Sequence, residues 1–197
     1  KSGLVDNPAV SQYRLTAHLS AAFLIYAYMF WVALSLLHPT GSKIGHPWYG
    51  KTVALTALIV ITVISGGFVA GLKAGKIYNT FPMMGNEWIP PDVMALDPWW
   101  LNFFENMGTV QFDHRILAIT TFVLIVAYWF CIPRHELPPR IAKGVNALLH
   151  TGILQVVLGV WTLLLVVPIS LASAHQAIAI VLFTVALYLC HGLHRAR

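Results

Sequence analysis

The sequence predicts an all-α integral membrane protein with five transmembrane helices. Of its 197 residues, 58% are hydrophobic and 10% are charged, and the mean hydropathy is +0.72. Soluble domains carry about 25% charged residues, so this composition excludes a soluble enzyme. A net charge of +5 would suggest nucleic-acid binding in a soluble protein, but the cations here lie mostly between apolar runs. We therefore expect membrane lipid, and no nucleic acid, around the chain.

Five apolar runs are the expected spans, because a helix rising 1.5 Å per residue needs about 20 residues to cross the hydrocarbon core. They cover residues 13–37, 52–72, 110–132, 143–167 and 169–193. The expected organisation is an outer N-terminal segment (1–12), one helix (13–37), a four-helix bundle (52–193) and an inner tail (194–197). The start Lys1-Ser2-Gly3 suggests a processed chain or a piece of a longer one.

Basic residues set the expected orientation. Lysines and arginines concentrate in the loops after the first and third spans and in the C-terminal tail, while every acid except Glu136 falls on the other face. Cytoplasmic or matrix loops are enriched in cations. The N-terminus and the long loop 73–109 are therefore expected outside.

The long loop and the residues before it carry two further signals. Tryptophans and phenylalanines alternate with prolines along 73–109, which predicts a segment lying on the membrane surface as an aromatic belt. Gly67, Gly71 and Gly75 recur every four residues, which lines small residues along one helix face. Another helix or a flat ligand can approach the backbone there.

Two histidines are the strongest candidates for a site. His114 follows Gln111-Phe112-Asp113 at the outer end of the third span, and His175 lies at a matching depth in the last. Ionisable groups inside a membrane mark function by default, and two imidazoles from facing helices form the usual axial pair of an electron-transfer haem. We interpret them as ligands of one haem iron. The alternative is a hydrogen-bond network that only holds the bundle together.

Polar neighbours have matching candidate roles. Gln111 lies one turn before His114 and can reach a haem edge, and Arg115 and Arg14 lie at a depth suited to propionates. Asp113 could orient His114 or pair with Arg115. His18 has the same depth in the first span, within a faint internal repeat, but the chain offers no second helix with a partner for it. Zinc fits less well, since no close Cys/His spacing occurs.

Longer motifs resemble the haem A synthase family, especially its mitochondrial and proteobacterial branch, including alphaproteobacteria. They are Gly67-Phe68-Val69-Ala70-Gly71-Leu72-Lys73-Ala74-Gly75-Lys76-Ile77-Tyr78-Asn79-Thr80-Phe81-Pro82-Met83-Met84-Gly85, Glu87-Trp88-Ile89-Pro90, Phe104-Glu105-Asn106, Gln111-Phe112-Asp113-His114-Arg115, Tyr13-Arg14-Leu15-Thr16-Ala17-His18-Leu19 and Ala174-His175-Gln176. The resemblance covers essentially the whole chain.

The resemblance implies a specific function. Members have eight spans in two similar halves, and this chain resembles the C-terminal portion, from the fourth span to the eighth. The implied enzyme oxidises the methyl group of haem o to the formyl group of haem a for cytochrome c oxidase. His114 and His175 would be the axial ligands of a haem b that relays electrons, in a haem-binding four-helix bundle. His18 would contact the substrate haem iron as half of a catalytic site.

The chain also departs from the family. The first half of the family carries a Glu-x-x-His-Arg motif that has no counterpart in this chain, and Gln111-Phe112-Asp113-His114-Arg115 is its repeat-mate, with an amide in place of the acid. An amide cannot act as a carboxylate base, so the chain alone is expected to hold haem b without catalysing. Expected partners are a polypeptide or segment carrying the first half, a ferredoxin-type electron donor and, as further candidates, haem O synthase and a second copy of the chain. The expected location is the mitochondrial inner membrane, or alternatively a bacterial plasma membrane.

Two other functions fit the same residues. A plain transmembrane cytochrome would use the His114 and His175 pair for electron transfer only. A membrane transporter would use the outer polar cluster as a selectivity site and would hold no iron.

Overall fold

The computed structural model describes residues 11–38 and 46–194. These parts contain five long helices: α1 (Gln12–Leu37), α2 (Tyr49–Gly71), α4 (Met107–Cys131), α5 (Pro139–Leu164) and α6 (Ile169–His194). All five are long and apolar enough to cross a membrane. No strand occurs in the described ranges. The predicted all-α membrane fold is therefore confirmed.

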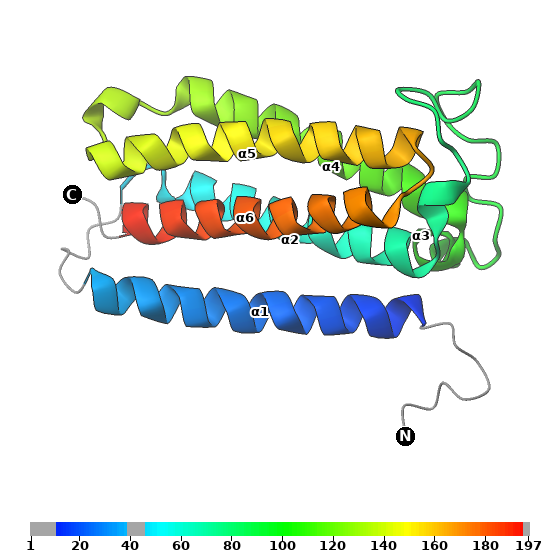
Figure 1. Cartoon of the computed structure of the whole chain (residues 1–197), viewed down its shortest axis with the longest axis horizontal. Coiled ribbons are helices and arrows are strands. Elements are labelled where there is room, and N and C mark those ends of the chain that lie inside the picture. Colours follow the sequence, from blue (N-terminus) through cyan, green and yellow to red (C-terminus); the bar gives the residue numbers. More distant parts are fainter. Residues whose placement is uncertain (1–10, 39–45, 195–197) are drawn as a thin grey trace.

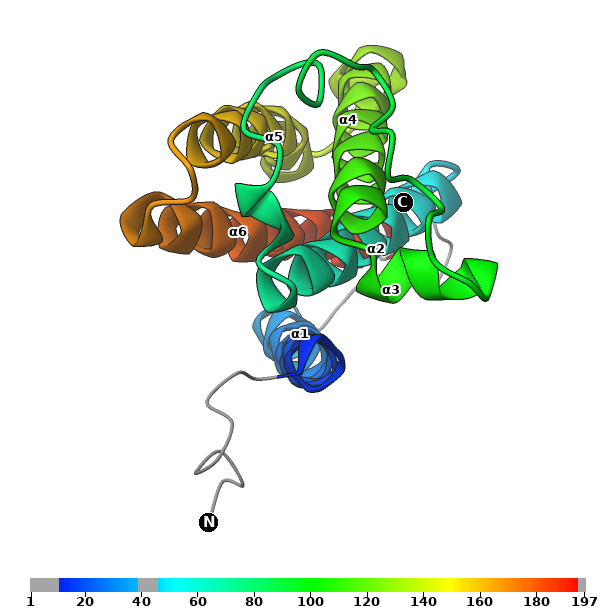
Figure 2. The same ribbon diagram turned by 90° about the vertical axis from the view of Figure 1, so that its right-hand side faces the viewer.

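Helices α2, α4, α5 and α6 form a four-helix bundle, and α1 lies outside it (Figure 1). Helices α4 and α6 each pack against both α2 and α5. In the end-on view, α4 and α6 therefore face each other diagonally across the bundle (Figure 2). Helix α1 contacts α2 and α6 only along its inner side. The five spans place the start of α1 and the end of α6 at opposite ends of the molecule.

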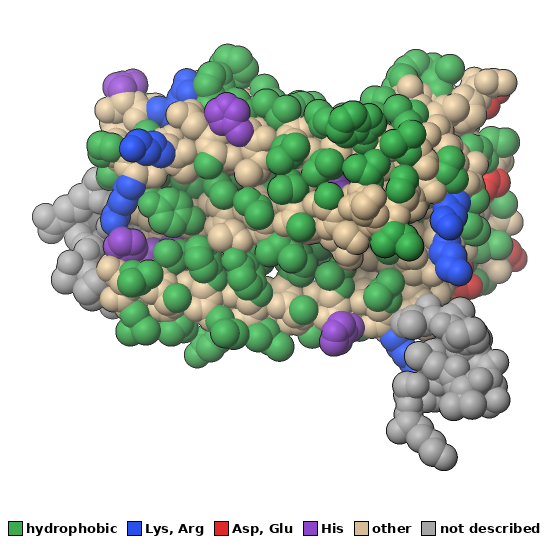
Figure 3. Space-filling view, viewed as in Figure 1, with side chains coloured by type: hydrophobic (Ala, Val, Ile, Leu, Met, Phe, Trp, Pro, Cys, Tyr) green, Lys and Arg blue, Asp and Glu red, His purple; other side chains and the backbone are tan. Residues whose placement is uncertain are grey.

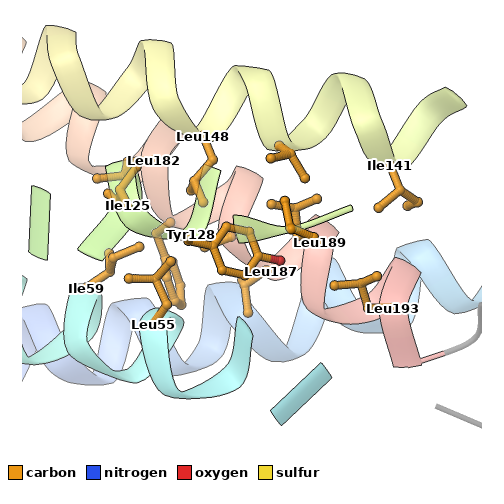
Figure 4. Packing of buried hydrophobic residues seen from close by; sticks show 14 of the residues in the cluster. Leu55, Ile59, Ile125, Tyr128, Ile141, Leu148, Leu182, Leu187, Leu189 and Leu193 are labelled. Atoms are coloured by element: carbon orange, nitrogen blue, oxygen red, sulfur yellow. The ribbon is translucent and has the colours of Figure 1, made fainter. Parts of the chain in front are cut away.

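The packed core occupies only the half of the bundle near the end of α6. Figure 4 shows Leu55 and Ile59 of α2 meeting side chains from α4, α5 and α6. Glycines allow the helices to approach closely there: a Cβ on Gly144 would lie 2.9 Å from the side chain of Leu189. Since lipid is as apolar as leucine, such close packing, rather than the hydrophobic effect, holds membrane helices together.

The predicted glycine stripe is a helix contact. Gly67 faces Thr16 and Leu19 of α1, and a Cβ on Gly71 would lie 2.6 Å from the backbone of Gln12. These two glycines hold the outer end of α1 against α2, which confirms that another helix approaches this face. Gly75 is not part of the stripe, because α2 ends at Gly71 and Gly75 faces Val167 instead.

Helix starts differ from the expected spans by about three residues. The third span begins at Met107 rather than residue 110, because the Asn106 side chain accepts a hydrogen bond from the Thr109 N–H at 3.1 Å and caps α4. The fourth begins at Pro139 rather than 143, with proline at the first helical position. The bundle likewise starts at Tyr49 rather than residue 52.

The long outer loop is more structured than expected. Between α2 and α4 it contains two short 3-10 helices, η1 (Ala74–Lys76) and η2 (Trp99–Leu101), and one turn of α-helix, α3 (Asn102–Glu105). Tryptophans of this loop are exposed, Trp88 by 69%, as an interfacial belt requires. The acidic side chains visible in Figure 3 also gather at this end of the molecule, which is consistent with the predicted orientation.

Candidate functional site

His114 and His175 lie in the same layer of the bundle. His114 follows the start of α4 by seven residues and His175 follows the start of α6 by six, which places both about 9–11 Å along the axis from the outer helix ends at 1.5 Å per residue. Helices α4 and α6 are diagonal, and the two rings are close enough to interact electrostatically. The two candidate ligands therefore approach the bundle interior from opposite corners.

The His114 ring is held by two consecutive residues of α2. The hydroxyl of Ser65 lies 2.8 Å from Nδ1 of His114. A Cβ on Gly66 would lie 3.1 Å from Cε1 of the same ring. Glycine thus leaves the space that the imidazole occupies, and serine fixes its orientation.

His175 has a similar setting on α5. A Cβ on Gly159 would lie 3.0 Å from Cε1 of His175, and the amide nitrogen of Gln155 lies 3.3 Å from Nε2. Nδ1 of His175 and Oε1 of Gln155 are buried with no hydrogen-bond partner among the described residues. Buried polar atoms without a partner are rare and costly, and Nδ1 of His175 is one that the described residues leave unsatisfied.

The layer around the two rings lacks a packed core. Fully buried residues are absent from four facing stretches, namely 60–66 of α2, 112–120 of α4, 153–161 of α5 and 169–181 of α6. The same helices bury many residues nearer the other end of the bundle. The two histidines therefore lie in a layer whose side chains are less completely buried than those of the core layer.

Two neutral imidazoles, one bearing an unpartnered nitrogen, are a donor set that haem iron accepts. Zinc would need more ligands, and no group of three or more histidine, cysteine or acidic side chains suited to a metal occurs in the described residues. The residues present therefore fit a haem held between α4 and α6.

Gln111 and Arg115 hold the outer loop to α4. Gln111 is 2% exposed, and its amide donates to the carbonyl of Tyr78 at 3.1 Å. The Arg115 guanidinium donates to the same carbonyl at 2.8 Å and to those of Thr80 and Met83 at 2.9 and 3.2 Å. Nε of Arg115 and Oε1 of Gln111 stay buried without a partner in the described structure. Both residues thus anchor the loop segment 78–83 to α4, and each keeps one buried polar atom without a partner.

Other candidates are placed differently. Among the described residues an ion pair joins His135 and Glu136, and none joins Asp113 and Arg115. Nδ1 of His114 contacts the Ser65 hydroxyl rather than Asp113. Neither role considered for Asp113 is therefore formed. Arg14 and His18 are exposed on α1, away from the bundle interior.

Asp92 accepts hydrogen bonds from two other residues of the loop region. The Tyr78 hydroxyl donates to its carboxylate at 2.6 Å, and the Asn106 amide donates to its backbone carbonyl at 2.6 Å. Gly108, at the start of α4, lies directly against that carboxylate. The hydrogen bond to Asp92, with a smaller contribution from burial, raises the pKa of Tyr78 above its ordinary value.

This hydrogen bond predicts an alkaline opening of the loop. The raised pKa of Tyr78 means that folding favours the protonated phenol, so its stabilisation is complete at neutral pH and is lost as pH rises through the raised pKa. Protease cleavage within 77–106 should increase above about pH 10, the ordinary pKa of tyrosine. The protease should cut the Tyr78→Phe variant faster at neutral pH, and its cleavage rate should depend less on pH. A wild-type pH profile retained in Tyr78→Phe would contradict this role.

Sequence reasoning missed Ser65, Gly66, Gln155 and Gly159. A serine, a glutamine and two glycines inside apolar spans were a detectable signal, because polar groups are expensive there. Their partners could not be assigned, since this requires the register of α2 against α4 and of α5 against α6.

The fold and the site define a multi-pass helical membrane protein with paired intramembrane histidines that suit a haem. Residues 1–187 match COX15-CtaA, described as cytochrome oxidase assembly protein, and the chain belongs to this family. It is 52% identical to Heme A synthase of Nitrosospira multiformis, over 99% of this chain and 56% of that protein. It is 45% identical to Heme A synthase COX15 of Arabidopsis thaliana and 43% identical to that of Homo sapiens, each over 99% of this chain and 46% and 48% of the relative.

These relatives confirm the resemblance to the haem A synthase family. The chain spans about half the length of the curated relatives it matches. No solved structure matches it.

Proposed function

We propose that this chain is the C-terminal part of a haem A synthase and holds a haem b through His114 and His175. The observation that carries the proposal is the placement of these two imidazoles in one layer, on diagonal helices, where the packed core is missing. Held by His114 and His175, a haem would supply one-electron transfer rather than oxygen chemistry.

The residues of the chain prepare this layer for the haem. Gly66 and Gly159 leave room for the two rings, while Ser65 and Gln155 contact one nitrogen of each. Gln111 and Arg115 fix the loop above, which limits entry of water from the outer side. The unused Nε of Arg115 is the proposed donor to a propionate, since guanidinium groups bind carboxylates well. Arg14, which is exposed on α1, is a second proposed donor to a haem propionate.

The proposal assigns the oxidation of haem o to haem a to this chain together with the part of its relatives that lies outside the match. Gln111 bears an amide and cannot take up a proton as a carboxylate would, so its proposed role is structural. His18 is exposed on α1 and would face the substrate haem, together with groups from the part of the relatives that lies outside the match. A ferredoxin-type donor would supply electrons, and haem O synthase and a second copy of the chain remain proposed partners. The proposed membrane is the mitochondrial inner membrane, or the plasma membrane if the source is bacterial.

The test is haem extraction from cells that make haem o but lack their own haem A synthase. Cells expressing residues 1–197 together with the first half of a full-length relative should accumulate haem a, and cells expressing either part alone should not. Bound haem b without haem a in the complete system would favour a plain cytochrome. A pyridine haemochrome assay near zero would favour a transporter.

A further inference from the structure

The two candidate ligands have unequal supports. Both rings rest on a glycine, Gly66 on α2 and Gly159 on α5. The residue just before Gly66 is Ser65, which contacts His114, whereas the residue just before Gly159 is Leu158, which carries no hydrogen-bonding group. His175 is instead contacted by Gln155, one turn further back, at a longer distance. The ring of His114 therefore has the shorter polar contact of the two.

The hydrogen bonds of Ser65 determine which nitrogen of His114 carries the proton. The Ser65 hydroxyl has a single hydrogen, and it lies 2.7 Å from the backbone carbonyl of Thr62 and 2.8 Å from Nδ1 of His114. A carbonyl can only accept, so the hydroxyl hydrogen goes to Thr62. The contact with Nδ1 is then a hydrogen bond only if Nδ1 carries the hydrogen and donates to Ser65, and the Thr62 carbonyl is a second acceptor for the His114 ring.

We propose that Ser65 is a positioning residue that fixes His114 as the Nδ1–H tautomer, so that Nε2 presents its lone pair to the iron. A neutral imidazole binds metal through the nitrogen without hydrogen, and the partner of the other nitrogen sets the tautomer and raises the basicity of the ligand. The atom of Gln155 that contacts His175 is its amide nitrogen, which only donates, so Nε2 of His175 is the acceptor of this longer contact. This inference rests on the proposed haem site, but the tautomer itself is a property of the chain without haem.

The first measurement needs no haem. In the 15N spectrum of the haem-free chain labelled at histidine, the His114 signal is the one lost in His114→Ala. Wild type should show a protonated Nδ1 and an unprotonated Nε2, and Ser65→Ala should show a mixture of tautomers. Ser65→Thr keeps the hydroxyl, and residue 65 borders an open pocket between α2, α3 and α4. This variant should resemble wild type.

The second measurement uses the haem-loaded chain. Without the acceptor on Nδ1, the imidazole is a weaker donor and stabilises ferric iron less. Ser65→Ala should lose haem about 10–100 times more readily. A tenfold loss of ferric over ferrous affinity would raise the one-electron potential by about 59 mV. Ser20→Ala is the matched control, since the Ser20 hydroxyl also donates to a carbonyl of its own helix, that of Thr16, and contacts no histidine.

The outcomes separate the two claims. An Nε2–H tautomer in wild type, or an unchanged tautomer and potential in Ser65→Ala, would overturn the role of Ser65 while leaving the haem site intact. Potential shifts of equal size in Ser65→Thr or Ser20→Ala would also overturn it. Failure of wild type to bind haem would remove the proposed function, and the 15N spectrum would still decide the tautomer.

Discussion

His114→Ala and His175→Ala are each expected to abolish the low-spin haem spectrum of the purified chain. The two rings approach from diagonal helices, so removal of either leaves one axial position without a protein ligand. The remaining imidazole cannot reproduce the bis-histidine ligand field. Haem content by pyridine haemochrome assay and the absorption spectrum check this result.

His150→Ala is the matched control, because His150 lies on α5 and is exposed. It should retain full haem content and an unchanged spectrum. A low-spin spectrum that survives in both His114→Ala and His175→Ala would contradict the ligand assignment.

Gly71→Ala is expected to detach the outer end of α1. The new Cβ would lie 2.6 Å from Cα and Cβ of Gln12, and backbone atoms cannot move aside as the end of a side chain can. Overpacking of this kind costs about 1–3 kcal/mol. Thermal unfolding in detergent and a spin-label distance between the outer ends of α1 and α4 measure the change.

Gly50→Ala provides the comparison within α2, since nothing lies within 4 Å of a Cβ at that position. Alanine favours a helix over glycine by about 1 kcal/mol, so this variant should be as stable as wild type or more so. Equal stability and equal label distances in both variants would show that α1 does not depend on the glycine stripe.

The membrane fold was predictable because its signals are local. Long apolar runs identify the five spans regardless of their partners, and cations place the loops. The start of α4 was less predictable, since it depends on the side chain of Asn106 folding back onto Thr109. Proline at 139 was a readable start signal for α5.

The candidate site was predictable only in part. The positions of His114 and His175 within their apolar runs were enough to predict that they lie in one layer. Helices that cross the same bilayer place residues at equal distances from their outer ends at the same depth. The roles of Gln111 and Arg115 in holding the loop could not be derived, since they depend on where the carbonyl of Tyr78 comes to lie. The supports from Ser65 and Gln155 depend likewise on helix register.

Electron–nuclear double resonance on the ferric chain with 15N-labelled histidine shows directly whether both imidazoles bind the iron. We expect one low-spin iron per chain with two directly coordinated histidine nitrogens, one of them lost in His114→Ala and the other in His175→Ala. A single coupled histidine, or an iron whose couplings persist in both variants, would contradict this expectation.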